Sequence, residues 1–328
     1  MTGMTGMTGT TGVTGDPKET VLRSATKEVV IGHGRRFCVI GERINPTGRR
    51  IFQEQLRAGD LSAIERDVAA QVEGGADVLD VNMGVPLTDE PDLLARAITL
   101  VQSLTDLPIC IDSSVVEALE AGLSVYQGRA LVNSVTAEDD RMAEILPLVK
   151  RYGAAVIALP NDHDEIPMEA DKRLVLTRKI VETAVGTYGL APEDIVIDPL
   201  AMPIGADPTI VKTAYDTIQR IRDEFGLNMT LGASNVSFGM PGRHTINATF
   251  LPMAMAVGLT SAIMDTRTPQ IVEAVKAADL LLGHDEWGSA WIAAHRSRQA
   301  AEKAAADTAA AADGSGSAPT SPQAVPAT

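Results

Sequence analysis

The chain has 328 residues, of which 45% are hydrophobic, and this is enough to bury the core of one large domain or two ordinary ones. Its formal net charge is −15 and its Lys and Arg residues form no long run, which argues against a nucleic-acid partner. We expect no membrane partner, because no apolar run is long enough to span a bilayer and the first residues lack the pattern of a signal peptide.

The two ends of the chain differ in composition from its middle. The first nine residues are three Met-Thr-Gly repeats, and residues 314–328 consist mainly of Gly, Ser, Ala, Pro and Thr. Such segments lack the apolar residues that a core requires. We expect a disordered tail over 1–26 and a low-complexity tail over 301–328. The remaining residues, 27–300, form one expected domain of about the usual length of a (β/α)8, or TIM, barrel.

Strand-like and helix-like patterns alternate through this domain. The apolar run Phe37–Ile40 predicts a first strand, which ends at the polar loop Glu42–Gly48. A helix over Ser62–Glu73 and a strand over Val78–Asn82 follow. Further strands are expected at Pro108–Asp112, Ala130–Asn133, Ala154–Leu159, Ile195–Asp198 and Leu259–Asp265. Further helices are expected at Glu90–Leu104, Val115–Gly122, Asp139–Tyr152, Ala170–Tyr188, Pro208–Phe225, His244–Val257 and Pro269–Leu282.

The stretch Leu231–Gly239 adds a seventh strand that ends in an unusual way. An apolar approach gives way to a polar elbow between two glycines. We expect the strand to be buried and its last residues, Ser234 and Asn235, to face a cavity. Because Ser and Asn also cap helices, this stretch alone leaves open whether the elbow is a ligand site or a helix start.

About eight strands with intervening helices predict an α/β protein with a parallel sheet covered on both faces. A single-domain (β/α)8 TIM barrel fits this count. The rival is a doubly wound open sheet, which usually has fewer strands and a glycine fingerprint after the first one. The segment Gly41–Asn45 does not match G-x-G-x-x-G, so the sequence favours the barrel.

The two cysteines, Cys38 and Cys110, both lie inside apolar strand-like runs. We expect them to be small buried side chains, not a disulfide or a metal-binding pair. Their reduced state favours a cytoplasmic location.

Polar side chains recur where the expected strands end. In a barrel these ends converge on one pocket, where barrel enzymes bind their ligands. Any one of these residues, such as Asp112, has an ordinary alternative role as a helix cap, but repetition at one strand after another indicates a site. The strand-end residues are Glu42, Asn45, Asp80, Asn82, Asp112, Asn133, Asp198, Asn235 and Asp265.

The residue types that are missing from the strand ends narrow the chemistry. None of the five histidines lies at an expected strand end, and no expected strand contains a lysine. A histidine-rich metal centre and a Schiff base are therefore not expected. A pocket of Asp, Asn and Ser suits a neutral heterocycle rich in donors and acceptors, such as a pterin.

The strand-end motifs resemble those of the methyltetrahydrofolate:corrinoid-protein methyltransferases, a pterin-binding family similar to the folate domain of cobalamin-dependent methionine synthase. The motifs run in order from Val39 to Asp265. They are Gly41–Asn45, Leu79–Asn82, Cys110–Ser113, Val132–Ser134, Ile197–Leu200, Ser234–Ser237, Asn247–Leu251 and Met253–Ala256.

This resemblance implies a function and roles for the site residues. The implied reaction moves a methyl group from 5-methyltetrahydrofolate to the cob(I)amide of a corrinoid (cobalamin) protein, or in reverse, and the implied assembly is a homodimer. Asp112, Asn133 and Asp198 would hydrogen-bond the pterin. Asp80 and Asn82 would lie beneath or beside it, and Ser234 and Arg243 would line the mouth. Asn235 would reach the methyl-bearing nitrogen, and we take it as the catalytic residue because a carboxamide stabilises a protonated nitrogen without titrating.

The corrinoid is expected to arrive on another protein, because the sequence has no D-x-H-x-x-G element for a cobalt-ligating histidine. Two alternatives stay open. A dihydropteroate synthase would have a similar pocket, but the Asp-Ser-Phe and Arg-x-His motifs of that family are absent after Asn45 and after Met264. A non-catalytic folate-binding subunit would carry the same binding residues.

Overall fold

The computed structural model describes residues 16–163 and 166–313. The chain divides into two compact units between His284 and Asp285. The second unit contains a short 3-10 turn, Glu286–Gly288, and the helix α10 (Ser289–Asp313). The expected boundary at 300, between the domain and the low-complexity tail, falls inside this helix, because the alanine-rich sequence continues as helix to Asp313. Residues 314–328 of that expected tail lie outside the described residues.

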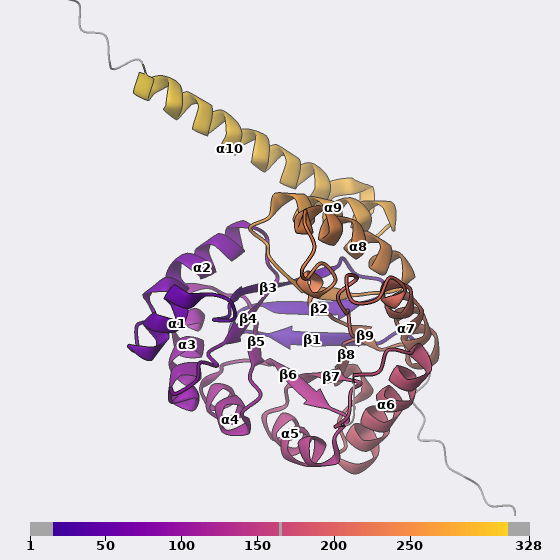
Figure 1. Cartoon of the computed structure of the whole chain (residues 1–328). Coiled ribbons are helices and arrows are strands. Elements are labelled where there is room, and N and C mark those ends of the chain that lie inside the picture. The colour runs from indigo at the N-terminus through magenta and orange to yellow at the C-terminus, as the bar shows by residue number, and fades with distance from the viewer. Residues whose placement is uncertain (1–15, 164–165, 314–328) are drawn as a thin grey trace, which may run out of the picture. The chain divides into compact units, whose positions relative to one another are not determined.

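The first unit is a (β/α)8 barrel, as predicted. Its eight strands are parallel neighbours in the order β10-β3-β4-β5-β6-β7-β8-β9, and helices surround them in Figure 1. A bridge between Gly232 and Ile263, with the Ile263 N–H 2.9 Å from the Leu231 carbonyl oxygen, joins the two edges of the sheet. The strands are β3 (Cys38–Ile44), β4 (Val78–Asn82), β5 (Ile109–Asp112), β6 (Leu131–Thr136), β7 (Ala155–Leu159), β8 (Ile195–Ile197), β9 (Asn228–Met229) and β10 (Ser261–Met264).

The helices that cover the barrel follow the order expected from the sequence, with one addition near the start, α1. Among the described residues, no helix is long and apolar enough to cross a membrane. The helices are α1 (Arg50–Arg57), α2 (Ser62–Glu73), α3 (Glu90–Leu104), α4 (Val116–Val125), α5 (Asp139–Tyr152), α6 (Ala170–Glu182), α7 (Ile210–Phe225), α8 (Arg243–Val257) and α9 (Pro269–Leu281).

The core has two layers because successive strand residues point to opposite faces of the sheet. One set, including Val39 and Leu79, packs under the helices, while the other, including Ile40 and Val78, fills the barrel interior. Cys110 is fully buried in the interior set. The interior apolar residues belong to the lower part of the strands, which leaves the carboxyl ends for polar side chains.

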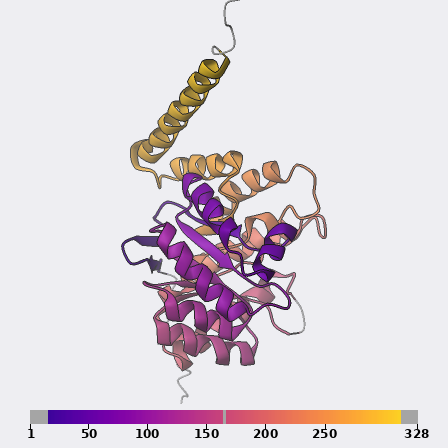
Figure 2. The ribbon, with the colours of Figure 1, turned by 90° about the vertical axis from the view of Figure 1, so that its left-hand side faces the viewer.

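A hairpin that the sequence analysis missed packs against the amino-terminal end of the barrel. Strands β1 (Glu19–Arg23) and β2 (Glu28–Gly32) pair antiparallel and lie at one end of the barrel in Figure 2. Leu22 and Ile31 are fully buried among the interior residues. The expected disordered tail over 1–26 is therefore wrong for residues 19–26, because burial of this apolar face offsets the cost of ordering them. Residues 1–15 lie outside the described residues.

The hairpin is expected to contribute measurably to stability. Leu22→Ala removes a fully buried side chain, and it should lower the free energy of unfolding by about 2–5 kcal/mol. Val21→Ala on the same strand, at a partly exposed position, should cost less. Urea denaturation of both variants measures the difference. If both variants lose the same small amount of unfolding free energy, the burial of Leu22 does not stabilise the barrel.

The predicted seventh strand is shorter and earlier than expected. Strand β9 is confined to Asn228–Met229, and Ala233–Asn235 forms one turn of 3-10 helix. Between β9 and this turn, the backbone is still bonded to strand β8, because the Thr230 N–H donates to the Ile197 carbonyl oxygen. The polar elbow is therefore a turn above the barrel, not the last residues of a strand.

Candidate active site

Three of the predicted site residues lie side by side at the carboxyl end of the barrel. Asn82 on β4 pairs in register with Asp112 on β5, and Asp112 pairs with Asn133 on β6. Residues in register on neighbouring parallel strands point to the same face of the sheet. The barrel thus places two carboxamides on either side of a carboxylate.

Asp80 lies one layer deeper on β4 and is only 2% exposed. The Asn133 amide donates to its Oδ1 at 3.3 Å, and the Cys110 thiol donates to the same carboxylate. Burial raises the pKa of Asp80 well above its usual value, and the nearby charge of Asp112 raises it further. Asp80 is therefore a buried support for Asn133, beneath the exposed part of the site.

The Asp112 carboxylate is not used as a helix cap. The neighbouring Ser113 instead accepts the Val115 N–H at 2.9 Å and donates to Glu90. Burial raises the pKa of Asp112 to about 6, the Asn82 amide lowers it, and the charge of Glu90 raises it. Since Asn82 Oδ1 accepts the Gly84 N–H at 2.8 Å, its NH2 group is the part left to donate to Asp112.

Asp198 follows β8, and its carboxylate is a third one with a raised pKa. Its Oδ1 accepts the Leu200 N–H at 2.8 Å. Burial raises the pKa of Asp198 to about 6, although this hydrogen bond and the charge of Arg173 both lower it. The second carboxylate oxygen has no other hydrogen bond among the described residues and is available to a ligand.

A second hydrogen-bonded group forms around the 3-10 turn after β9. The Ser234 hydroxyl donates to Glu42 at 3.2 and 3.3 Å, while Arg243 donates to the Ser234 carbonyl at 2.7 Å and to the Ser237 hydroxyl at 3.1 Å. Arg243, at the start of α8, thereby fixes the turn that presents Asn235. The Asn235 side chain is exposed and has no hydrogen bond among the described residues, so its carboxamide is free to meet a ligand.

The Asn235 carboxamide lies close to Gly232, and a side chain at position 232 would displace it. A Cβ at position 232 would lie 2.9 Å from Asn235 Nδ2, closer than real Cβ contacts. Gly232 therefore lets the carboxamide fold back over the end of the strand. The glycine next to the elbow in the sequence was the signal for this approach.

Glu42 is a site residue that the sequence analysis noted at a strand end but did not include among the binding residues. Burial raises its pKa, and the charge of Asp265 raises it further; the Ser234 hydroxyl and the charges of Arg243 and Arg267 oppose the rise. Its partner Ser234 is 192 residues away in the chain. That distance is why the pair could not be recognised from the sequence.

Among the described residues, one group of possible metal ligands lies at the start of α5 and on the loop after β7. Glu138, Asp140 and His163 have ligand atoms within 4.8 Å of one another. However, His163 Nδ1 faces Glu138 at 3.6 Å and Nε2 faces Asp140 at 3.4 Å. The two ring nitrogens of His163 thus point to different carboxylates, and neither nitrogen faces both of them.

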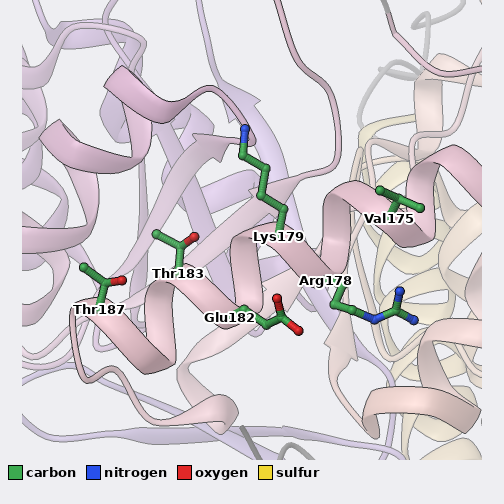
Figure 3. Close-up of a pocket in the computed structure, with 6 residues that line it drawn as sticks. All are labelled: Val175, Arg178, Lys179, Glu182, Thr183 and Thr187. Atoms are coloured by element: carbon green, nitrogen blue, oxygen red, sulfur yellow. The ribbon is translucent and has the colours of Figure 1, made fainter. Parts of the chain in front are cut away.

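A separate hollow of about 500 Å³ lies on the outer layer of helices, along α6 (Figure 3). Its two cations are already paired, Arg178 with Glu224 and Lys179 with Asp139 at 2.9 Å. It therefore lacks a free charge for an anionic ligand, and it contains none of the strand-end residues. The lining residues are Val175, Arg178, Lys179, Glu182, Thr183 and Thr187.

Comparison with known proteins identifies the family of this chain. Residues 41–265 match the model of the pterin binding enzymes. The chain is 33% identical over 255 residues to the methylcorrinoid:tetrahydrofolate methyltransferase of Eubacterium limosum, covering 76% of this chain and 92% of that protein. It is 34% identical over 239 residues to the methionine synthase of Mycobacterium tuberculosis, covering 69% of this chain but 20% of that longer protein.

Solved structures confirm the fold. The dihydropteroate synthase of Xanthomonas albilineans in complex with 7,8-dihydropteroate superimposes with a TM-score of 0.59 at 18% identity, covering 80% of this chain and 98% of that one. The dihydropteroate synthase of Vibrio fischeri gives the same TM-score, identity and coverage. At such low identity these structures establish the barrel alone. The family match and the coverage of the E. limosum enzyme show that this chain belongs to the pterin-binding enzymes, in the group of the methylcorrinoid:tetrahydrofolate methyltransferases.

Proposed function

We propose that this chain transfers a methyl group between 5-methyltetrahydrofolate and the cobalt of a corrinoid carried by a separate protein. One observation carries the proposal. Carboxylate and amide side chains lie side by side at the ends of neighbouring strands, and the free carboxamide of Asn235 lies on the turn above them. The first group suits a pterin ring, and the second suits the reacting nitrogen. The likeness to a methyltransferase over 92% of that enzyme's length supports the choice of reaction.

The proposed pterin contacts follow from what each side chain has left to offer. The carboxylates of Asp112 and Asp198 accept hydrogen bonds from the amino group and ring N–H of the pterin, while Asn133 pairs with it as an amide. Asp80 and Asn82 hold Asn133 and Asp112 in place from beneath and beside them. Buried pairs of this kind give specificity because an analogue lacking the donor leaves a carboxylate unpaired.

The methyl-transfer step requires a change of charge at N5 of the folate. The methyl carbon bonds to the electron pair of cob(I)amide, the C–N bonding pair returns to N5, and N5 carries a proton in the tetrahydrofolate product. Asn235 stabilises the N–H at this nitrogen without titrating. Glu42 is the ionisable group hydrogen-bonded to the same turn, through Ser234, and burial raises its pKa. We assign it as the acid that gives this proton to N5 as the C–N bond breaks and is left as a carboxylate.

The corrinoid partner is proposed to dock over the barrel mouth. Phe238 is 68% exposed and lies three residues after Asn235, and Leu87, on the loop after β4, is fully exposed. We take these two exposed apolar side chains, on loops at the carboxyl end of the barrel, as contacts for the partner. A corrinoid face placed against Phe238 would bring its cobalt to the Asn235 turn.

Phe238→Glu tests this docking surface. We expect it to raise the KM for cob(I)alamin by about tenfold or more and to leave the Kd for 5-methyltetrahydrofolate unchanged, because a carboxylate removes an apolar contact from the rim but not from the folate site. Val175→Glu, at a position 60% exposed on the outer face of α6, is the matched control. An unchanged KM for Phe238→Glu, or an equal rise in the control, would exclude this surface.

Two other functions would use a similar pocket. A dihydropteroate synthase would condense a pterin diphosphate with 4-aminobenzoate, and a non-catalytic subunit would only bind folate. Product analysis with each substrate pair separates the three: we expect methylcobalamin from 5-methyltetrahydrofolate and cob(I)alamin, and no pteroate. Pteroate formation, or folate binding without either product, would favour an alternative.

The assembly and location are also proposed. We infer a homodimer from the family resemblance, and light scattering is expected to give twice the 34.6 kDa mass of the chain. A value equal to the chain mass would contradict this. A cytoplasmic location is supported by Cys38 and Cys110, which are free and buried.

A further inference from the structure

Arg173 on α6 is a fully buried arginine close to the proposed folate site. It is 0% exposed and is the largest of the fully buried side chains. Its Nε donates to the carbonyl oxygen of Pro167 at 2.8 Å, and its Nη1 donates to those of Pro199 and Leu200 at 2.7 and 2.9 Å. One guanidinium thus ties the loop before α6 to the loop after β8.

The charge of Arg173 has an unusual environment. Among the described residues, its Nη2 has no hydrogen-bond partner, and the bonds of its other nitrogens all go to backbone carbonyl oxygens. Burial lowers the pKa of Arg173, and the charge of Asp198 opposes this. A buried cation is costly unless an anion compensates it. Asp198, which we place in the folate site, is the carboxylate whose charge favours the charged form of Arg173.

The same arginine braces the turn that orients Asp198. The Leu200 N–H donates to Asp198 Oδ1, and Leu200 has a φ of +61°, in the left-handed region that residues other than glycine rarely adopt. The carbonyl groups of Pro199 and Leu200 point to Arg173. The turn is therefore held from both sides, by Asp198 within it and by Arg173 behind it.

We propose that Arg173 is a positioning residue for folate recognition, which braces the Asp198–Leu200 turn and supplies the positive charge that holds Asp198 as an acceptor for the pterin. This inference rests on the proposed function. It assigns a role in substrate binding to a side chain of the helix layer that is enclosed by the protein.

The electrostatics of Asp198 support this role. Burial raises its pKa to about 6, and Arg173 is the charged side chain that counteracts the rise. The charged residues beside Arg173 on α6 and at its start, Glu169, Asp171 and Lys172, are exposed, so solvent screens them. Without Arg173, Asp198 would hold its proton to a higher pH and would lose its value as an acceptor.

Affinity for 5-methyltetrahydrofolate across pH 5.5–8.5, measured by calorimetry, tests the proposal. In the unaltered protein, affinity should fall near pH 6 as the site carboxylates gain protons. Arg173→Gln should raise the pH of this loss by about one unit, because an adjacent opposite charge shifts a pKa by about one to three units. Arg173→Lys keeps the charge and should keep the original pH of loss, with affinity lower by about threefold because lysine lacks the planar fork.

A background variant separates positioning of Asp198 from a general structural effect. In Asp198→Asn, only protonation of Asp112 remains to lower the affinity on acidification. Adding Arg173→Gln to this variant should therefore leave the pH of that fall unchanged. An unshifted profile in Arg173→Gln, or an equal shift in that double variant, would overturn the proposal. If circular dichroism shows that Arg173→Gln is unfolded, Arg173→Lys alone decides. A rise in the pH at which this variant loses affinity for 5-methyltetrahydrofolate would then overturn the proposal. Absence of folate binding in the unaltered protein would instead contradict the proposed function.

Discussion

Replacing Asn235 with alanine is expected to lower kcat for methyl transfer by about a hundredfold to a thousandfold, the usual effect of removing a group that stabilises charge formed in the transition state. The Kd for 5-methyltetrahydrofolate should change by less than about threefold, because Asn235 acts on the N–H formed during reaction and not on the bound methyl form. Single-turnover transfer to cob(I)alamin gives the rate, and calorimetry gives the Kd.

The aspartate variant of the same residue is the matched control. Asn235→Asp keeps an oxygen that accepts the developing N–H and should therefore lose less activity than Asn235→Ala. The Ser234 and Arg243 contacts use backbone and hydroxyl atoms, so either change leaves the turn intact. An unchanged rate in Asn235→Ala at saturating folate would remove this residue from the mechanism and leave it a positioning role at most.

Replacing Asp112 with asparagine is expected to weaken binding of 5-methyltetrahydrofolate by about ten- to a hundredfold at pH 7.5, since hydrogen bonds to a charged acceptor contribute about 1.5–3 kcal/mol. The asparagine keeps the shape of the side chain but replaces one accepting oxygen with a donor. Calorimetry at fixed pH measures the loss. Glu117→Gln, at an exposed position in the first turn of α4, is the control and should bind normally.

The pH dependence of binding follows from the same carboxylate. The pKa of Asp112 in the folded protein is about 6, so the accepting form dominates above pH 6 and disappears below it. Affinity of the unaltered protein should therefore fall on acidification from pH 7.5 to 5. In Asp112→Asn part of this dependence is lost, with the rest set by Asp198. A flat profile in the unaltered protein would exclude both carboxylates as acceptors.

Much of the barrel could be predicted because its signals are local. The helix α3 begins where Asp89 accepts the Asp92 N–H, and α5 ends at Gly153 with a φ of +61°. The hairpin β1–β2 could not be predicted in this way. Its two short strands depend on burying Leu22 and Ile31 in a barrel assembled from the rest of the chain, and no local signal reports that.

The site shows the same division. The placement of Asn82, Asp112 and Asn133 side by side could be predicted because parallel strands bring their carboxyl ends to one place. The bond between Ser234 and Glu42 depends on closure of the barrel. Arg173 directly follows two charged residues, Asp171 and Lys172, in a helical pattern, and such a run of charges is typical of an exposed face. Its burial depends on two loops whose paths the sequence does not reveal.

Methyl transfer to free cobalamin tests the central claim most directly. The protein is mixed without oxygen with 5-methyltetrahydrofolate and cob(I)alamin, and the visible spectrum is followed. We predict that cob(I)alamin is converted to methylcobalamin at a rate proportional to protein concentration, with an equal amount of tetrahydrofolate released. A protein that binds 5-methyltetrahydrofolate but leaves the cob(I)alamin spectrum unchanged would contradict the assignment as a methyltransferase.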